Sequence, residues 1–423
     1  VMKNLRDHIY NAIFNAEASI RYEEILIPLH MVRELLIVKY NSLYLDELES
    51  LIDKVTIFKT HFAALDIRQN HSVHEQTVTE ILKREKLIQN SLADIDESVL
   101  IDILLHQNIE INENNFEEAI IKDTIRTFRI LQLVQQKNGA EGCNRYIISN
   151  SEDIFSVLFV YALFRWCGWQ NREITFDIVP LFESMEGMKN SGGIMQKLFD
   201  IQEYKRHVCN RQNKQTIMLG FSDGTKDGGY LKANWSIFQT KEILSEVCQA
   251  NDIKAIFFDG RGGPPARGGG KTHRFYAAHG KKIANHEIQL TIQGQTITST
   301  YGTKEHFMFN CEQLLTAGLS NHIFKEENAI SNANNQLISQ LAQISFAKYT
   351  SLKNHPKFVP YLENKSTLRY YGQANIGSRP VKRGHEKKLE FKDLRAISFV
   401  GSWSQLKQNV PGFFGIGTAI QVL

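Results

Sequence analysis

The apolar positions follow a helical pattern in the first third of the chain. Up to about Thr60 they recur every three or four residues, which predicts amphipathic helices. One such stripe consists of Leu45, Leu48, Leu51, Ile52, Val55 and Phe58. Residues 86–138 are charged and mostly helical as well, and the polar break NIEINENN indicates a surface connection. The pattern therefore predicts a mainly helical region over residues 1–140.

One strand-like segment interrupts this helical region. The apolar run 63–67 ends in Arg68, so an arginine lies at the end of a short strand. Ser72 and Glu75 then form a capping-box pattern, which predicts a helix that continues to Lys83.

From Asn144 onward, short apolar runs alternate with longer helical patterns. The strand-like runs are Arg145–Ser149, Phe176–Phe182, Thr216–Gly220 and Ala255–Phe258. Two of the helices are expected from about Asp153 to Cys167 and from about Gly229 to Ala250. This alternation is the signature of βαβ units and indicates a parallel sheet, in either a barrel or a doubly wound arrangement.

Charged residues follow several of these strands. Glu183 comes directly after its strand, and Asp223 and Lys226 lie a few residues after the next one, in GFSDGTKDGG. Arg261 and Arg267 follow the last one, in FFDGRGGPPARGGGKT. Because the loops after parallel strands open on one face, we expect these side chains to converge on one pocket. Each charge taken singly could also belong to an ordinary exposed loop.

The residue types in this group indicate a metal and an anion. Glu183 and Asp223 offer carboxylate oxygens, which suit Mg²⁺ or Mn²⁺. Two arginines and a lysine beside such a metal imply a multiply charged anionic substrate. The sequence therefore predicts a metal-assisted reaction on an anion.

The glycine-rich run around the two arginines allows several interpretations. Glycine lets a backbone approach a ligand closely, and the run contains Gly262, Gly263, Gly268, Gly269 and Gly270. We interpret it as an anion-holding loop, with a flexible linker and an arginine-glycine RNA-binding segment as alternatives. Its end, GGGKT, is not a P-loop, because the required first glycine falls at Pro265.

Composition narrows the class of protein. The 423 residues are 42% hydrophobic and 22% charged, enough for a large core. A formal charge of +3 is too small to indicate a nucleic-acid or membrane partner. Five widely spaced cysteines without a CxxC pair favour reduced thiols in a cytoplasmic protein. The chain begins inside a helical pattern and ends on the apolar FFGIGTAIQVL, so we expect an internal piece of a longer chain.

Six segments closely resemble, in order and spacing, the phosphoenolpyruvate carboxylase family. They are LDIRQ (65–69), VPLFESMEGM (179–188), GFSDGTKDGG (220–229), FDGRGGPPARGGGKTH (258–273), GSRP (377–380), and LRAI (394–397) followed by SWSQ (402–405). The resemblance implies a (β/α)8 TIM-type barrel elaborated by many α-helices, incomplete in this chain. It also implies a homotetramer when full-length. The implied domains are the helical region 1–140, a barrel portion 141–310 with the metal and glycine-loop sites, and a helical portion 311–423 with GSRP and LRAI.

The resemblance further implies an anaplerotic reaction of phosphoenolpyruvate with bicarbonate to give oxaloacetate and phosphate, with Mg²⁺ or Mn²⁺. In the family, this proceeds through carboxyphosphate and the enolate of pyruvate. By motif, Glu183 and Asp223 resemble the metal ligands and Lys226 the catalytic lysine. The arginines resemble phosphate-holding residues (Arg68, Arg261 and Arg395), the mobile-loop arginine near carboxyphosphate (Arg267) and a residue of the GSRP segment (Arg379).

The chain departs from the family pattern in three ways. Asp259 stands where the family usually has histidine before GRGG. The family's catalytic histidine lies in an amino-terminal half that this sequence does not include, and its final helical segment is also missing. We therefore expect this piece alone to be inactive. Two other classes remain as alternatives: another phosphoenolpyruvate- or pyruvate-handling barrel enzyme, and a non-catalytic protein that binds anions or RNA through the glycine-arginine run.

Overall fold

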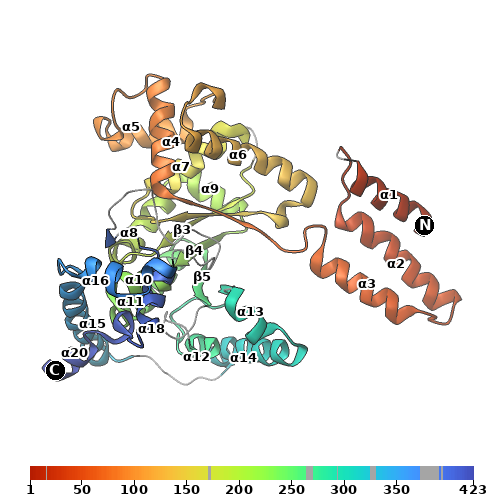
Figure 1. The fold of residues 1–423 in the computed structure, drawn as a ribbon. Coiled ribbons are helices and arrows are strands. Elements are labelled where there is room, and N and C mark those ends of the chain that lie inside the picture. The colour runs from red at the N-terminus through yellow and green to blue at the C-terminus, as the bar shows by residue number, and fades with distance from the viewer. Residues whose placement is uncertain are drawn as a thin grey trace. The chain divides into compact units, whose positions relative to one another are not determined.

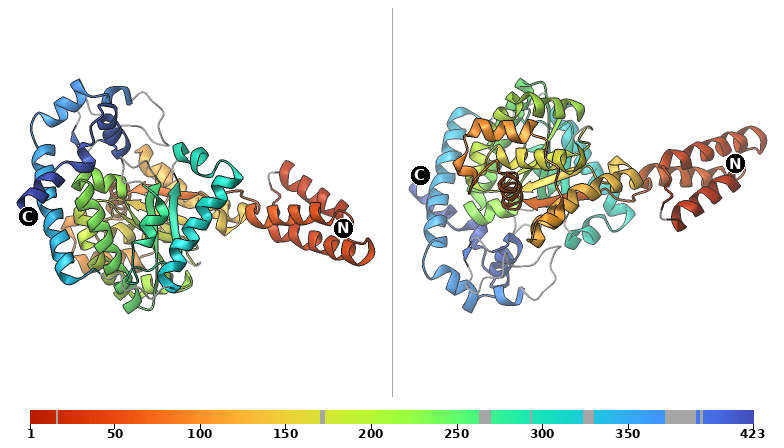
Figure 2. Two further views of the ribbon diagram at one scale, coloured as in Figure 1. Left: turned by 90° about the horizontal axis from the view of Figure 1, so that it is seen from below. Right: turned by 90° about the horizontal axis from the view of Figure 1, so that it is seen from above.

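The computed structural model describes residues 1–15, 17–169, 173–262, 270–292, 294–323, 330–371, 390–391 and 394–423. The chain divides into two compact units, and Figures 1 and 2 show its helices and strands coloured along the sequence. Unit 1 consists of Val1–Ile147 and Leu158–Ile178, and unit 2 of Ile148–Val157 and Val179–Leu423. Among the described residues, no helix is both long and apolar enough to cross a membrane.

Three helices form the start of unit 1: α1 (Met2–Phe14), α2 (Tyr22–Lys39) and α3 (Leu45–Phe58) (Figure 1). Their small core centres on Leu5, Leu29 and Ile52. The stripe expected on α3 is narrower than the sequence suggests, because Leu51 and Phe58 are exposed. Helical spacing alone cannot tell the centre of a buried face from its edge.

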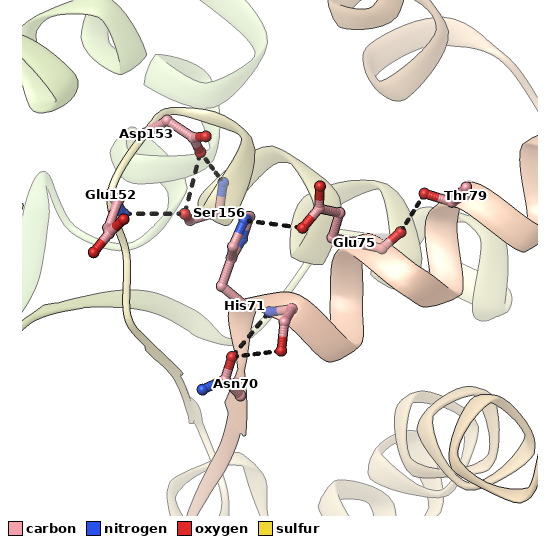
Figure 3. Close-up of polar contacts among 8 residues, drawn as sticks. Asn70, His71, Glu75, Thr79, Glu152, Asp153 and Ser156 are labelled. Atoms are coloured by element: carbon pink, nitrogen blue, oxygen red, sulfur yellow. Dashed lines mark hydrogen bonds and ion pairs between the residues drawn. The ribbon is translucent and has the colours of Figure 1, made fainter. Parts of the chain in front are cut away.

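The strand-like segment of unit 1 is β1 (Asp66–Asn70), so Arg68 lies inside the strand and not at its end. Helix α4 (His71–Arg84) follows directly. Its cap is Asn70, whose Oδ1 accepts hydrogen bonds from the Ser72 N–H at 2.9 Å and the Ser72 Oγ–H at 2.8 Å (Figure 3). The expected cap at Ser72 is therefore wrong, because the asparagine two residues earlier satisfies the first free amides.

Glu75 consequently has another partner. Its carboxylate lies 3.8 Å from Nε2 of His71, one turn earlier, and its carbonyl accepts a hydrogen bond from Thr79 Oγ (Figure 3). The sequence pattern identified the helix but not the residue that begins it.

The remaining helices of unit 1 surround a buried aromatic cluster. They are α5 (Glu97–His106), α6 (Ala119–Asn138), most of α7 (Phe155–Phe164) and short turns at Leu92–Asp94, Glu113–Asn115, Ala140–Gly142 and Arg165–Trp169. Phe128 of α6 stacks on Tyr146 of β2 (Arg145–Ser149) at 4.9 Å between ring centroids. Tyr146 also shares a 2.9 Å hydrogen bond with Nε2 of His74, which is fully buried. Burial lowers the pKa of His74 to about 3 because a charged ring would lose its hydration.

This buried histidine should make the chain sensitive to acid. The unfolded ring protonates below pH 6.5, whereas the native ring stays neutral until about pH 3. The native state thus binds fewer protons in this window, and stability should fall as pH decreases. We expect about 3 kcal/mol less stability at pH 4 than at pH 6.5 from this group. Urea unfolding at both pH values should show a smaller loss of stability in His74→Gln than in the wild type. His30→Gln, at an exposed position, should lose as much stability as the wild type. Equal losses in the wild type and in both variants would contradict the assignment to His74.

Unit 2 contains a parallel sheet at its centre. Its strands are β3 (Asp177–Phe182), β4 (Lys214–Leu219), β5 (Lys254–Gly262) and β6 (Ile288–Ile292). These four strands pair in parallel, and each pairs with the next along the chain. The six described strands follow the order β1-β2-β3-β4-β5-β6. The expected parallel sheet is confirmed as a curled sheet in a mostly helical chain, compatible with an incomplete barrel; the sequence pattern missed β6.

Helices cover the strands of unit 2. Those that follow β3 and β4 are α8 (Met185–Asp200), α9 (Gln202–Asn210), α10 (Phe221–Gly228) and α11 (Tyr230–Ala250). Those that follow β5 and β6 are α12 (Thr272–Ala277), α13 (Gly294–Tyr301), α14 (Lys304–Ile323) and α15 (Asn332–Lys353). The last are α16 (Phe358–Lys365), α17 (Leu368–Tyr371), α18 (Ala396–Gln405), α19 (Val410–Phe413) and α20 (Ile416–Val422). A buried cluster that includes Phe358, Leu394 and Trp403 holds α16, α17 and α18 together.

Candidate functional site

The carboxyl ends of β3 and β4 lie side by side. Phe182, the last residue of β3, is in register with Leu219, the last residue of β4. The next residues are Glu183 and Gly220, and the Gly220 N–H donates a 3.0 Å hydrogen bond to the Phe182 carbonyl. The sheet therefore brings two of the sequence motifs together at one edge, as expected from the convergence of loops after parallel strands.

Gly220 leaves room for the side chain of Glu183. A Cβ atom at position 220 would lie 2.4 Å from Glu183 Cβ and 3.6 Å from its Oε2. Any residue larger than glycine would therefore overlap the Cβ of Glu183, and one of the two residues would have to move. Glu183 is buried, with 4% of its surface exposed, and its Oε1 accepts a 3.1 Å hydrogen bond from the Asn150 N–H. The backbone thus holds this carboxylate in one orientation.

The segment that supplies the Asn150 N–H is ordered by its own side chains. Asp153 accepts hydrogen bonds from the N–H and Oγ–H of Ser156, at 3.0 and 3.2 Å (Figure 3). Ser156 Oγ in turn accepts from the Glu152 N–H at 3.4 Å (Figure 3). Glu152 receives a hydrogen bond from Ser184, the residue after Glu183. These contacts support the position of Glu183 from the loop after β2.

The segment GFSDGTKDGG is helical, which corrects its interpretation as a loop. Helix α10 begins after Gly220 and ends at Gly228, and the residue that caps it, Gly229, has a φ of 74°. Its glycines and aspartates disfavour a helix by intrinsic propensity. Packing against α11, α18 and β5 overrides that preference. Asp223 lies in the first turn, where the helix dipole favours a negative charge, and Lys226 lies one turn later on the same side.

Glu183 and Asp223 are the two carboxylates that the sequence motifs single out in unit 2. Glu183 directly follows β3 and Asp223 lies in the first turn of α10, which follows β4; both offer hard carboxylate oxygens, and the absence of a side chain at Gly220 leaves space beside Glu183. Within the described residues, no group of three or more His, Cys, Asp or Glu side chains could hold a metal ion. A pair of carboxylates suits Mg²⁺ or Mn²⁺, which complete their coordination with water and substrate oxygens.

Lys226 reaches from α10 to the start of α18. Its Nζ donates a 2.7 Å hydrogen bond to the Leu394 carbonyl and lies 5.0 Å from the centre of the Phe391 ring. The lysine is buried, with 8% of its surface exposed. Arg395, the next residue after Leu394, is the N-cap of α18. Folding therefore brings Leu394, the residue before Arg395, into contact with Lys226 across 168 residues of sequence.

Asp227 and Lys353 hold the helix that carries Asp223 and Lys226, and the sequence pattern did not identify either residue. Lys353 Nζ, from α15, donates to the Asp227 Oδ1 at 2.8 Å and to its carbonyl at 2.5 Å. The other carboxylate oxygen, Oδ2, accepts a 3.1 Å hydrogen bond from the Met185 N–H at the start of α8. Tyr349 of α15 donates to the Lys226 carbonyl at 2.7 Å. Asp227 thus connects the helix that carries Asp223 to the helix that follows Glu183.

Loss of this connection should weaken metal binding. We expect Asp227→Asn to lower the affinity for Mn²⁺ about tenfold, as is typical when a side chain that orients a metal ligand is changed. Titration of Mn²⁺ followed by the paramagnetic resonance of the free ion would measure it. Asp200→Asn, at the exposed end of α8, is the matched control and should bind Mn²⁺ normally. Equal affinity in the two variants would remove Asp227 from this role.

The structure places the other candidate residues as follows. Arg261 and Gly262 lie in β5, which extends four residues beyond the expected end at Phe258, and the strand contains a register shift between Asp259 and Gly262. Gly270 is described and has a φ of 119°, which favours glycine. Arg68 belongs to unit 1. The candidates Gly263, Arg267, Gly268, Gly269 and Arg379 lie outside the described residues.

Comparison with known proteins agrees with this set of motifs. The family model for phosphoenolpyruvate carboxylase matches residues 2–423. The chain is 32% identical over 389 residues to a phosphoenolpyruvate carboxylase of Corynebacterium glutamicum, which covers 89% of this chain and 42% of that protein. It is 30% identical over 406 residues to one of Gloeobacter violaceus, which covers 94% of this chain and 43% of that protein. The chain thus spans about two fifths of the length of these curated relatives.

Proposed function

Since the chain belongs to the phosphoenolpyruvate carboxylase family, we propose that the full-length protein carboxylates phosphoenolpyruvate with bicarbonate to give oxaloacetate and phosphate. The single observation that carries this proposal is the match to that family over residues 2–423. The location of Glu183 directly after β3 and of Asp223 and Lys226 in the helix that follows the neighbouring β4 supports it. In a cell this reaction would be anaplerotic, because it replenishes a four-carbon acid.

Glu183 and Asp223 are proposed to hold Mg²⁺ or Mn²⁺. When bound, such an ion would neutralise negative charge that develops on substrate oxygens. Glu183 is oriented for this role by the Asn150 N–H and by the space beside Gly220. The buried position of Glu183 keeps it from being saturated by water, which strengthens its interaction with any cation.

The cationic side chains are proposed to bind and activate the substrates. Lys226 would place its ammonium group next to the oxygen that becomes negative when the phosphoryl group leaves. Three arginines would hold the phosphoryl group: Arg68, Arg261 and Arg395. Arg267 would lie near carboxyphosphate after bicarbonate attacks the phosphorus atom and the enolate of pyruvate forms. Arg379, in the GSRP segment, would contribute to the same anionic site.

The wider architecture follows from the same family membership. We propose that the complete protein closes the curled sheet into a (β/α)8 barrel and assembles as a homotetramer. The mainly helical region 1–140, the barrel portion 141–310 and the helical portion 311–423 are proposed as its functional divisions.

An assay of oxaloacetate formation tests the function. The full-length protein, supplied with phosphoenolpyruvate, bicarbonate and Mg²⁺, should produce oxaloacetate, which malate dehydrogenase converts with oxidation of NADH. Omission of bicarbonate should abolish the signal. Turnover of phosphoenolpyruvate to pyruvate without need for bicarbonate would favour another barrel enzyme of phosphoenolpyruvate. Salt-dependent RNA binding, with no response to phosphoenolpyruvate and Mg²⁺, would favour the non-catalytic alternative.

The chain of 423 residues alone should have little or no activity in that assay. The expected reason is that the family's catalytic histidine is not within this sequence. Circular dichroism should first establish that the isolated chain is folded. Turnover by the isolated chain at a rate near that of the full-length protein would show that these residues suffice.

A further inference from the structure

A buried ion pair joins α11 to the end of β5. Lys241 Nζ and Asp259 Oδ2 are 2.8 Å apart, and the two side chains are 1% and 0% exposed. The Tyr276 hydroxyl of α12 donates a second hydrogen bond to the same oxygen at 2.8 Å. One carboxylate oxygen therefore connects three elements of unit 2.

The ammonium group of Lys241 also faces three aromatic rings. Its Nζ lies 5.0 Å from the centre of the Phe257 ring, 5.1 Å from that of Phe275 and 5.7 Å from that of Tyr276. These distances are those of cation–π interactions. Phe257 belongs to β5, and the other two rings belong to α12. Lys241 thus contacts both β5 and α12, through its ion pair with Asp259 and through the aromatic rings around its ammonium group.

A buried ion pair of this kind adds little net stability to the folded protein. Two charges lose their hydration on burial, and well-packed apolar residues in their place are often as stabilising or more so. Asp259 Oδ1 is buried and has no hydrogen-bond partner, which adds a further cost. The pair instead fixes the orientation of the backbone at Asp259, because the Asp259 carboxylate accepts hydrogen bonds from two donors, Lys241 Nζ and the Tyr276 hydroxyl.

The ion pair lies next to a segment of the proposed site whose orientation matters for binding. Asp259 precedes Arg261 by two residues in β5, and the register of β5 against β6 shifts between Asp259 and Gly262. Tyr276 lies in α12, the first element after the glycine-arginine run. The strand before this run and the helix after it are therefore tied to the same buried charge.

Asp259 is also the position at which the chain departs from the histidine usual in the family. An imidazole there would leave the buried ammonium group of Lys241 without an anion. Asp259 and Lys241 are therefore complementary, and the structure supplies the partner for an acid that the sequence pattern alone left unexplained.

We infer that Lys241, Asp259 and Tyr276 form a positioning unit that sets the direction of the end of β5, where Arg261 lies, and of the start of α12, and that this direction matters for binding of phosphoenolpyruvate. This inference rests on the proposed function. None of the three residues is taken to touch substrate; they act through the backbone on either side of the run.

A double variant separates positioning from stability. Lys241→Met with Asp259→Leu replaces the pair by apolar residues and should retain the unfolding midpoint of the wild type. The matched control is Lys214→Met with Glu287→Leu, which removes an exposed 2.8 Å ion pair at the amino ends of β4 and β6. Tyr276→Phe removes one donor and leaves the ion pair in place, so its effect should lie between the two.

Two measurements on the full-length protein test the inference. Hydrogen exchange should accelerate in the 258–262 and 272–277 segments of the Lys241/Asp259 variant and not in the control. The KM for phosphoenolpyruvate should rise about tenfold in that variant, which corresponds to about 1.4 kcal/mol, with a smaller change in kcat.

The outcomes keep this inference distinct from the proposed function. Wild-type exchange or an unchanged KM in the Lys241/Asp259 variant would overturn the positioning role and leave the carboxylase proposal standing. Slow exchange in the wild type together with no oxaloacetate formation would refute the carboxylase proposal and, with it, the link to phosphoenolpyruvate. Loss of folding in the double variant would also overturn the inference, since the pair would then be needed for stability.

Discussion

Replacement of Lys226 by methionine in the full-length protein should reduce kcat for carboxylation by about 100- to 1,000-fold, the usual cost of losing one preorganised group that stabilises developing charge. Methionine retains the length and much of the packing of the lysine stem. The variant loses the charge and the 2.7 Å hydrogen bond to the Leu394 carbonyl. Rates at saturating phosphoenolpyruvate, together with unfolding midpoints, would separate a catalytic defect from a folding defect.

Two further variants sharpen this result. Lys226→Arg keeps the charge but replaces a compact ammonium by a planar fork, which does not fit the single contact to the Leu394 carbonyl, so we expect only partial activity. Lys197→Met changes an exposed lysine of α8 and should be fully active. Normal kcat in Lys226→Met would exclude the lysine from the chemistry and leave it as a link between α10 and α18.

Neutralisation of either carboxylate should impair the use of metal. In Glu183→Gln, an amide oxygen can still accept from the Asn150 N–H, so the local structure is retained while the negative charge is lost. Asp223→Asn makes the same change in the first turn of α10. We expect the concentration of Mn²⁺ needed for half-maximal activity to rise about 100-fold in each, because a neutral amide is a much weaker ligand for a hard cation.

The control for this prediction lies three residues from Glu183. Glu186→Gln neutralises an exposed carboxylate in the first turn of α8, whose contact is with Asn190 on the same helix. It should bind Mn²⁺ like the wild type. Direct measurement of Mn²⁺ binding, without substrate, guards against effects on catalysis alone. If Glu183→Gln retained the wild-type affinity, the metal would have to be held by other residues.

Much of the sheet could be read from local sequence. The run Arg145–Ser149 is a strand with the expected bounds, and the next two strands differ from expectation by one or two residues. Runs of this kind are recognisable because buried parallel strands are almost continuously apolar. Helix α10 was not recognisable in the same way, because its glycines and aspartates are typical of turns and only packing makes it helical.

The supporting residues of the site were also beyond local patterns. Lys353 lies 126 residues from Asp227, and Leu394 lies 168 residues from Lys226. A lysine near the end of a helix has the same local sequence signature whether it is solvated or directed at a carboxylate. Only the packing of α15 and α18 against α10 determines which of these holds.

By itself, the sequence determined the family, the parallel strands and the residue types available for metal and phosphate, because these depend on short-range periodicity and on motifs of contiguous residues. The tertiary structure alone decided how the residues are combined. It placed Glu183 beside Gly220, joined Lys226 to the start of α18, and gave Asp259 its partners in Lys241 and Tyr276. The physical reason is that contacts between distant charged groups are set by how helices pack on the sheet, and packing has no local signature in the chain.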